Sequence, residues 1–113
     1  MQSGQFVVFV HLRADTSWLR LSRSERNDIA TGALAPIFAK HPDIKHQHFD
    51  AEAFDGRVSD VEMIAAPDAR YFYDFFEDFR DSRLIAHGYF AIVDIFATFA
   101  DGYKEFERSL AEG

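Results

Sequence analysis

The distribution of hydrophobic and polar residues along this chain predicts four β-strands. Residues 6–12 are apolar at odd and even positions alike, which is typical of a central strand covered on both faces. Residues 88–98 repeat this character near the other end of the chain. Between them, residues 44–54 and 57–66 flank the dipeptide Asp55-Gly56, which favours a hairpin turn.

Two segments between these strands have helical periodicity. Ser22 and Glu25 form the capping-box pattern at the start of the first helix. Pro36 lies inside this helix and predicts a kink or a restart near Ala35, because proline lacks the N–H and clashes with the preceding turn. The second helix begins after Asp68, a predicted N-cap. Its apolar stripe consists of Phe72, Phe75, Phe76 and Phe79.

The remaining segments are shorter. Residues 13–21 have no clean period and predict an ordered loop. A final helix after Gly102 is expected to turn Tyr103, Phe106 and Leu110 inward.

The order strand–helix–strand–strand–helix–strand predicts an α+β fold. It closes most simply as a ferredoxin-like βαββαβ domain, with an antiparallel sheet, both helices on one face and an added C-terminal helix. We expect one domain over residues 1–113, with residues 1–4 flexible. The central strands are apolar on both faces, and large exposed apolar faces are rare in monomers. The pattern therefore predicts a homodimer in which a second copy covers the helix-free face, as in a dimeric α+β barrel.

Composition narrows the classes of function. The 113 residues include 13 phenylalanines and no cysteine, so an aromatic core is expected and thiol chemistry is excluded. The net charge of −7 argues against nucleic acid and anionic membranes as partners, although Arg20, Arg23 and Arg26 could form a local basic site. The apolar run 6–10 is too short for a signal peptide or a membrane span, so a cytoplasmic location is expected.

A polar stripe marks the strand 44–54. Its even positions place His46, His48, Asp50 and Glu52 on one face, because successive side chains of a strand alternate. A two-residue turn would set Asp50 opposite Val61. A three-residue turn would instead set Asp50 opposite Asp60 and His48 opposite Glu62, and it separates apolar from polar faces better. We favour the second register, with the stripe directed toward the helix-free face or its rim.

This stripe has three interpretations that the spacing leaves open. The simplest is a solvated edge strand whose charges prevent edge-to-edge aggregation. Alternatively, the facing carboxylates share a proton and serve acid–base chemistry or ligand binding through His48 and Asp50. A divalent metal is the third interpretation, with ligands drawn from His46, His48, Asp50 and Glu62.

A second candidate group involves the first and last strands. Asp94 interrupts an apolar run and would be costly to bury without a partner. A pair with His11 would make a proton-transfer dyad, with Asp94 as base and His11 as orienter, or else a structural ion pair. Arg13 and Trp18 are candidates to hold an anionic or aromatic ligand, although Trp18 could simply pack under its own loop.

Several strong motifs are absent from the sequence. It has no glycine-rich phosphate loop, dinucleotide fingerprint, zinc-protease helix or nucleophile elbow. Chemistry driven by nucleotides is therefore not a leading hypothesis.

The stretch FVHLRADTSWLRLSRSER resembles the start of the darcynin family of small bacterial proteins, and the closing segment IVDIF extends the resemblance. Its most specific part runs from the first strand through Trp18-Leu19 to Ser22-x-x-Glu25-Arg26. The resemblance implies a family of uncharacterised function and supplies no catalytic residues. More distantly, the element order is similar to the dimeric α+β barrel superfamily, which includes cofactor-independent monooxygenases, muconolactone-isomerase-like enzymes, haem-dependent chlorite dismutases and ligand-sensing domains.

Three functional hypotheses follow. The first is a small-molecule-binding dimer with a pocket between sheet and helices, which acts on or binds an aromatic or anionic metabolite without a cofactor. The second is a metal or haem protein that uses His46 and His48. The third is a non-catalytic interaction module. The sequence does not decide whether the protein is an enzyme.

Overall fold

The computed structural model describes residues 2–113, so that Met1, part of the predicted flexible segment 1–4, lies outside the described residues. In chain order, the helices and strands are β1 (Phe6–Ala14), α1 (Thr16–Leu19), α2 (Arg23–Lys40), β2 (Lys45–Asp50), β3 (Asp60–Ala66), α3 (Ala69–Asp81), α4 (Arg83–Ala86), β4 (Phe90–Phe99) and α5 (Gly102–Glu112). None of the helices within this range has the length and apolar character needed to cross a membrane.

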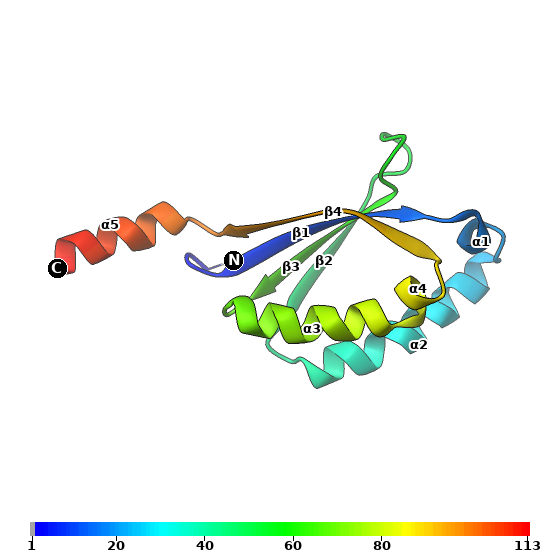
Figure 1. Cartoon of the computed structure of the whole chain (residues 1–113), viewed down its shortest axis with the longest axis horizontal. Helices are drawn as coiled ribbons and strands as arrows, with labels where there is room; N and C mark the ends of the chain where they lie inside the picture. Colours follow the sequence, from blue (N-terminus) through cyan, green and yellow to red (C-terminus); the bar gives the residue numbers. More distant parts are fainter. Residues whose placement is uncertain (1) are drawn as a thin grey trace.

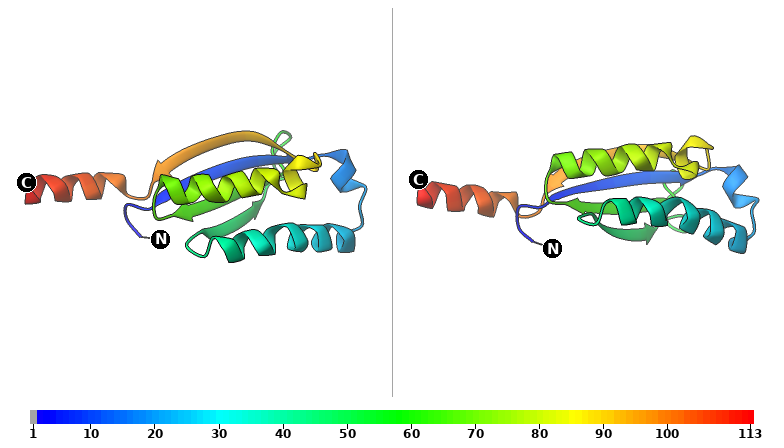
Figure 2. Two further views of the ribbon diagram at one scale, coloured as in Figure 1. Left: turned by 60° about the horizontal axis from the view of Figure 1, so that its bottom comes forward. Right: turned by 90° about the horizontal axis from the view of Figure 1, so that it is seen from below.

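The four strands form one sheet in the order β2–β3–β1–β4, and every pair of neighbours is antiparallel. Both long helices, α2 and α3, lie on the same side of this sheet (Figures 1 and 2). This arrangement confirms the predicted ferredoxin-like α+β fold, with β1 as a central strand and β2 and β4 at the two edges.

The core lies between the sheet and the two long helices. Val8, Val10 and Leu12 of β1 alternate onto the helical side and are almost fully buried. They meet the phenylalanine stripe of α3, in which Phe75 is 2% exposed. Burial of one such ring contributes about 1.5–3 kcal/mol, so this layer dominates the stability of the domain.

Two predicted caps are confirmed, and helix α2 does not restart near Ala35, one of the two outcomes predicted for Pro36. The Ser22 hydroxyl accepts from the Glu25 N–H at the start of α2, and Asp68 accepts from two N–H groups at the start of α3. Helix α2 continues from Arg23 to Lys40 across Pro36.

Residues 13–21 do not form the predicted loop throughout. Asp15 caps the short helix α1, because its carboxylate accepts from the Ser17 N–H at 2.9 Å. Trp18 lies in this helix, and its ring packs against Tyr89 and Phe90 at centroid distances of 5.3 and 4.9 Å. Contacts with a distant segment hold this turn, and local periodicity does not show them.

The predicted register of β2 and β3 is confirmed, but the predicted turn is wrong. Asp50 pairs with Asp60 and His48 pairs with Glu62. The strands end earlier than expected, and residues 51–59 form a longer loop. Asp55 organises this loop, since its carboxylate accepts from the backbone N–H groups of Arg57 and Val58 at 2.7 and 2.9 Å.

Helix α5 does not fold inward as predicted. It projects away from the sheet and helices (Figure 1), and Tyr103, Phe106 and Leu110 are all more than 60% exposed. Hydrogen bonding between the segments of β1 and β4 continues almost to the start of α5, where the Gly4 N–H donates to the Ala100 carbonyl. This pairing directs the chain outward from the end of the sheet.

The helix-free face of the sheet carries a cluster of apolar side chains. Register places Phe9, Phe49, Val61, Met63 and Phe96 on this face. The Phe9 and Phe96 rings stack at 5.4 Å, while Phe49 and Phe96 are 48% and 45% exposed. In a homodimer, a second copy would bury this apolar surface and the apolar side chains of α5. The homodimer stays a prediction.

We therefore expect Phe49→Asp to weaken self-association, because a carboxylate on this face would lose hydration on contact. The dissociation constant of the dimer should rise by at least about tenfold, the effect of losing one well-placed anchor. Sedimentation equilibrium would measure it, with Tyr73→Asp on the outer surface of α3 as the control. A wild-type protein that stays monomeric at high micromolar concentration would contradict the prediction.

Candidate functional site

A cavity of about 400 Å³ lies between the sheet and helices α2 and α3. Most of its lining is apolar and aromatic. The apolar lining residues are Val10, Leu12, Trp18, Ala30, Leu34, Phe38, Ile64, Phe75, Phe76, Phe79, Leu84 and Phe90.

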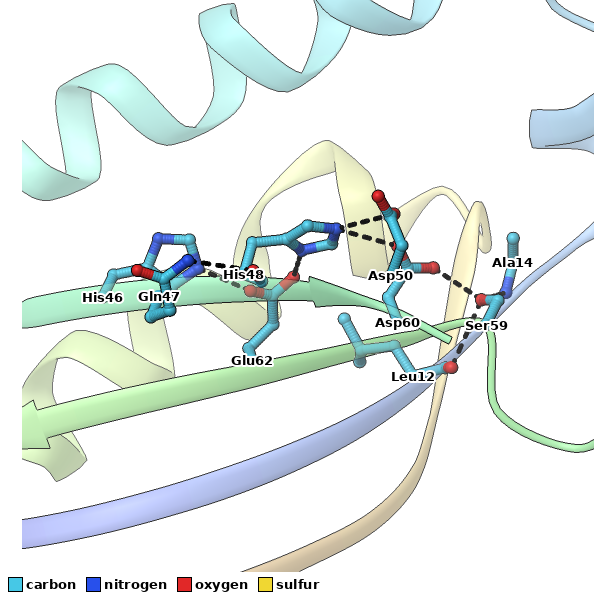
Figure 3. A network of polar contacts seen from close by, with 9 residues as sticks. All are labelled: Leu12, Ala14, His46, Gln47, His48, Asp50, Ser59, Asp60 and Glu62. Carbon is cyan, nitrogen blue, oxygen red and sulfur yellow. Dashed lines mark hydrogen bonds and ion pairs between the residues drawn. The ribbon is translucent and has the colours of Figure 1, made fainter. Parts of the chain in front are cut away.

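One wall of this cavity is polar and consists of His46, His48, Asp50, Asp60 and Glu62. We call these five residues the polar wall. They come from alternate positions of β2 and β3, and the register places them side by side (Figure 3). The expectation that the stripe faces the helix-free side is wrong, because Phe49 and Val61 occupy that side and direct their neighbours toward the helices.

Glu62 holds both histidines of the polar wall. One carboxylate oxygen lies 2.5 Å from His46 Nε2, and the other lies 2.5 Å from His48 Nδ1. The Glu62 side chain is only 15% exposed, while His48 is 40% exposed. A mostly buried carboxylate therefore fixes the orientation of the more accessible imidazole ring.

The other nitrogen of His48 faces two aspartates. Its Nε2 lies 3.1 Å from Asp50 Oδ1 and 3.3 Å from Asp60 Oδ1. Asp60 is in turn held by Ser59, whose hydroxyl donates to Asp60 Oδ2 at 2.6 Å. Ser59 also accepts from the Ala14 N–H at 2.7 Å, so the end of β1 positions this carboxylate (Figure 3).

Burial and nearby charges shift the pKa values of two residues of the polar wall, Asp60 and His48. Burial is the main cause that raises the pKa of Asp60, and the charges of Glu62 and Glu52 add to the rise against the Ser59 hydrogen bond and the His48 charge. For His48, burial opposes the charged form. The hydrogen bonds that the His48 ring donates to Glu62 and Asp50, together with the nearby negative charges, outweigh this effect, so the pKa of His48 is raised.

This arrangement supports two kinds of chemistry. An imidazole oriented by a carboxylate can accept or release a proton beside a bound molecule. The same imidazole nitrogen, with two aspartate oxygens nearby, can also bind a divalent cation.

The dyad predicted from the first and last strands is not assembled in the single chain. His11 and Asp94 pair across β1 and β4, but no ion pair joins them among the described residues. Asp94 is exposed on the helix-free face and accepts from the Ile95 N–H, so the expected burial is wrong. The register between β1 and β4 shifts between His11 and Leu12, next to this pair.

Of the four predicted ligand-binding residues, the structure brings three to the cavity. His48 and Asp50 belong to the polar wall, and Trp18 also lines the cavity. Arg13 is exposed and donates to the Arg57 carbonyl at 2.7 Å, away from the cavity lining.

Sequence reasoning missed the role of Arg26 in the lining. Its Nε and Nη2 donate to the carbonyls of Trp18 and Leu19 at 3.1 and 2.7 Å, so it anchors α1 to α2. The clustering of arginines between residues 20 and 26 was the available signal, and only Arg26 of that group lines the cavity.

The raised pKa of His48 leads to a pH prediction. In protein treated with EDTA, His48 should titrate above the ordinary histidine value of about 6.5. The folded state then binds this proton more tightly than the unfolded state, so the added stability is complete below about pH 6.5 and is lost as the pH rises through the folded pKa. Nuclear magnetic resonance of the ring nitrogens would measure the titration.

Glu62→Gln should lower the pKa of His48, because it removes the first of the contacts that favour the charged form. Glu77→Gln, on the solvent side of α3, is the matched control and should leave it unchanged. A His48 pKa that does not respond to Glu62→Gln would refute this account of the polar wall.

Solved structures share the fold at low sequence identity. A protein from Thermus thermophilus, described as a novel haem-binding protein, matches with a TM-score of 0.80 at 14% identity, over 98% of this chain and 46% of that one. Chlorite dismutase from Candidatus Nitrospira defluvii in complex with imidazole matches with a TM-score of 0.75 at 13% identity, over 88% of this chain and 41% of that one. The chain thus spans less than half of these proteins.

Sequence relatives are more similar. The protein "Darcynin" of Chromobacterium violaceum is 38% identical over 79 residues, which cover 70% of this chain and 100% of the relative. "Darcynin 1" of Acinetobacter baumannii is 33% identical over 89 residues, which cover 79% of this chain and 99% of the relative. The family model described as "Darcynin, domain of unknown function" matches residues 3–110. The chain therefore belongs to the darcynin family.

Proposed function

We propose that this protein binds a small aromatic molecule in the cavity, with a hydroxyl group of that molecule directed at the polar wall. The observation that carries the proposal is the coincidence of an apolar cavity with five converging ionisable side chains. Binding sites typically combine an apolar lining with a few placed polar groups.

The size and lining of the cavity suit a molecule of this class. Its volume of about 400 Å³ falls within the usual range of small-molecule sites, roughly 300–1,000 Å³. Trp18, Phe38 and Phe90 offer ring surfaces on which an aromatic ligand can pack edge-to-face or offset.

The charges of the lining favour a hydrogen-bond donor over an anion. Three carboxylates belong to the polar wall, whereas Arg26 is the one lysine or arginine among the described lining residues, and its guanidinium already donates to two carbonyls. An anionic ligand would meet uncompensated negative charge, while a phenolic hydroxyl would find acceptors. We therefore narrow the sequence-based hypothesis from an aromatic or anionic ligand to a hydroxylated aromatic one.

Calorimetric titration of EDTA-treated protein with 4-ethylphenol tests this proposal. We expect saturable binding of one molecule per chain and a change in the emission of Trp18, the sole tryptophan of the sequence. Ethylbenzene and benzoate should bind more weakly, because the first lacks the hydroxyl and the second carries a charge that the wall repels.

Ala30→Phe should weaken 4-ethylphenol binding by at least about tenfold, because its ring would fill the cavity that Ala30 lines. Ala39→Phe, on the same helix but outside the cavity lining, is the matched control. Equal binding by both variants would refute the cavity as the site, and stronger binding of benzoate than of 4-ethylphenol would refute the ligand class.

Haem is a second candidate, and the fold likeness to a described haem-binding protein favours it. The lining residues of this chain do not fit haem. The two carboxylate groups of haem would find one cation among the described lining residues, Arg26, whose guanidinium already donates to two carbonyls. The three carboxylates of the polar wall, Asp50, Asp60 and Glu62, would also repel the haem carboxylates.

We therefore expect titration with haemin to produce no sharp Soret band with an endpoint at one haem per chain. Absorption spectroscopy measures this. A saturable endpoint that disappears in a His48→Gln or His46→Gln variant would instead establish haem as the ligand.

A further inference from the structure

We infer that His48, Asp50 and Asp60 form a binding site for one divalent transition-metal ion. The inference deepens the proposed function, because the ion would sit in the polar wall and receive the ligand's hydroxyl oxygen. Metal binding by the three residues does not itself depend on the aromatic ligand.

The spacing of the three side chains fits one ion. One nitrogen of His48 and one oxygen of each aspartate all lie within 4.8 Å of one another. The imidazole nitrogen is 3.1 and 3.3 Å from the two nearest oxygens. Ligand atoms on a tetrahedral ion at about 2.1 Å lie roughly 3–4 Å apart, so small rotations of the side chains suffice.

The surroundings support each of the inner ligands. Metal-binding histidines generally direct their second ring nitrogen at a carboxylate, and His48 directs Nδ1 at Glu62. Ligating carboxylates generally accept a further hydrogen bond, and Asp60 accepts one from Ser59. Asp50, by contrast, is 75% exposed and can turn toward an ion at little cost.

The backbone register supplies an independent reason for a cation. Asp50 and Asp60 are direct partners across the two strands, where like charges are destabilising. His48 can offset only one of these charges when it is protonated. A divalent ion would offset both and leave the imidazole neutral, the form in which it binds metal.

The adjacent cavity provides the place for a further ligand of the ion. All three residues line it, so at least one coordination position would face the bound molecule. Three protein ligands with an open position are typical of catalytic rather than structural zinc sites. One imidazole with two carboxylates suits Zn²⁺, Fe²⁺ or Mn²⁺, whereas an all-oxygen set would suit Mg²⁺ or Ca²⁺.

Titration of the full chain with Co²⁺, in the absence of any phenol, tests the inference. We expect binding of one ion per chain with visible absorption bands, and a rise in melting temperature on addition of Zn²⁺. His48→Gln should abolish both signals, and Asp60→Asn should weaken binding by at least about tenfold. Glu62→Gln, which changes the support of His48, should weaken it about 10- to 100-fold.

Two controls separate this site from other metal-binding groups. His87→Gln and Asp43→Asn remove an exposed histidine and an exposed aspartate away from the polar wall, and both should bind Co²⁺ like the wild type. Unchanged binding in His48→Gln, or loss of binding in His87→Gln, would overturn the site. Asp50→Asn tests the site in a variant that should still fold. Because Asp50 is exposed, the melting temperature without metal should be unchanged, while the affinity for Co²⁺ should fall.

The two proposals can fail separately. Ala30→Phe should block 4-ethylphenol and leave Co²⁺ binding intact. If wild-type protein binds 4-ethylphenol after EDTA treatment but takes up no Co²⁺, the metal site is overturned and the ligand pocket stands. If Co²⁺ binds but 4-ethylphenol does not, the ligand pocket is overturned and the metal site stands.

Discussion

Antiparallel pairing of β2 with β3 is the constraint on which the candidate site depends. It places Asp50 beside Asp60 and His48 beside Glu62, on the side that faces the helices. A shift by one residue would send the side chains of β2 to the opposite face. The pairing is held by Phe49 and Val61 on one side and by Ile64 in the core on the other, so apolar contacts keep a repulsive set of charges together.

The helices and the rest of the sheet form the cavity that the polar wall faces. Helix α3 covers the middle of the sheet with Phe75, Phe76 and Phe79, and these rings close the floor of the cavity. Helix α1 brings Trp18 to the lining, anchored through Arg26. The cavity therefore arises because the helices bury the inner side of β1 but leave that of β2 partly open.

Local patterns predicted the parts of this arrangement that depend on a few neighbouring residues. The caps at Ser22 and Asp68 have the expected structure, and the register followed because one pairing separated apolar from polar side chains better. The direction of the polar wall depended instead on which face the helices cover, and alternation alone does not distinguish the two faces. The loop 51–59 follows from a side-chain cap by Asp55 rather than from a tight Asp-Gly turn. Helix α5 has an apolar stripe like that of a packed helix, yet strand pairing at its root directs it outward.

The position of β2 at the sheet edge has a consequence for dynamics. An edge strand has hydrogen-bonded neighbours on one side only, and all six residues of β2 are exposed, so local opening should cost less there than in β1. Two histidines and one aspartate of the polar wall lie on this strand, and their partners lie on the more buried β3. Any molecule or ion that bridges the two strands would act as a clamp, and its affinity would be coupled to the hydrogen-exchange protection of β2.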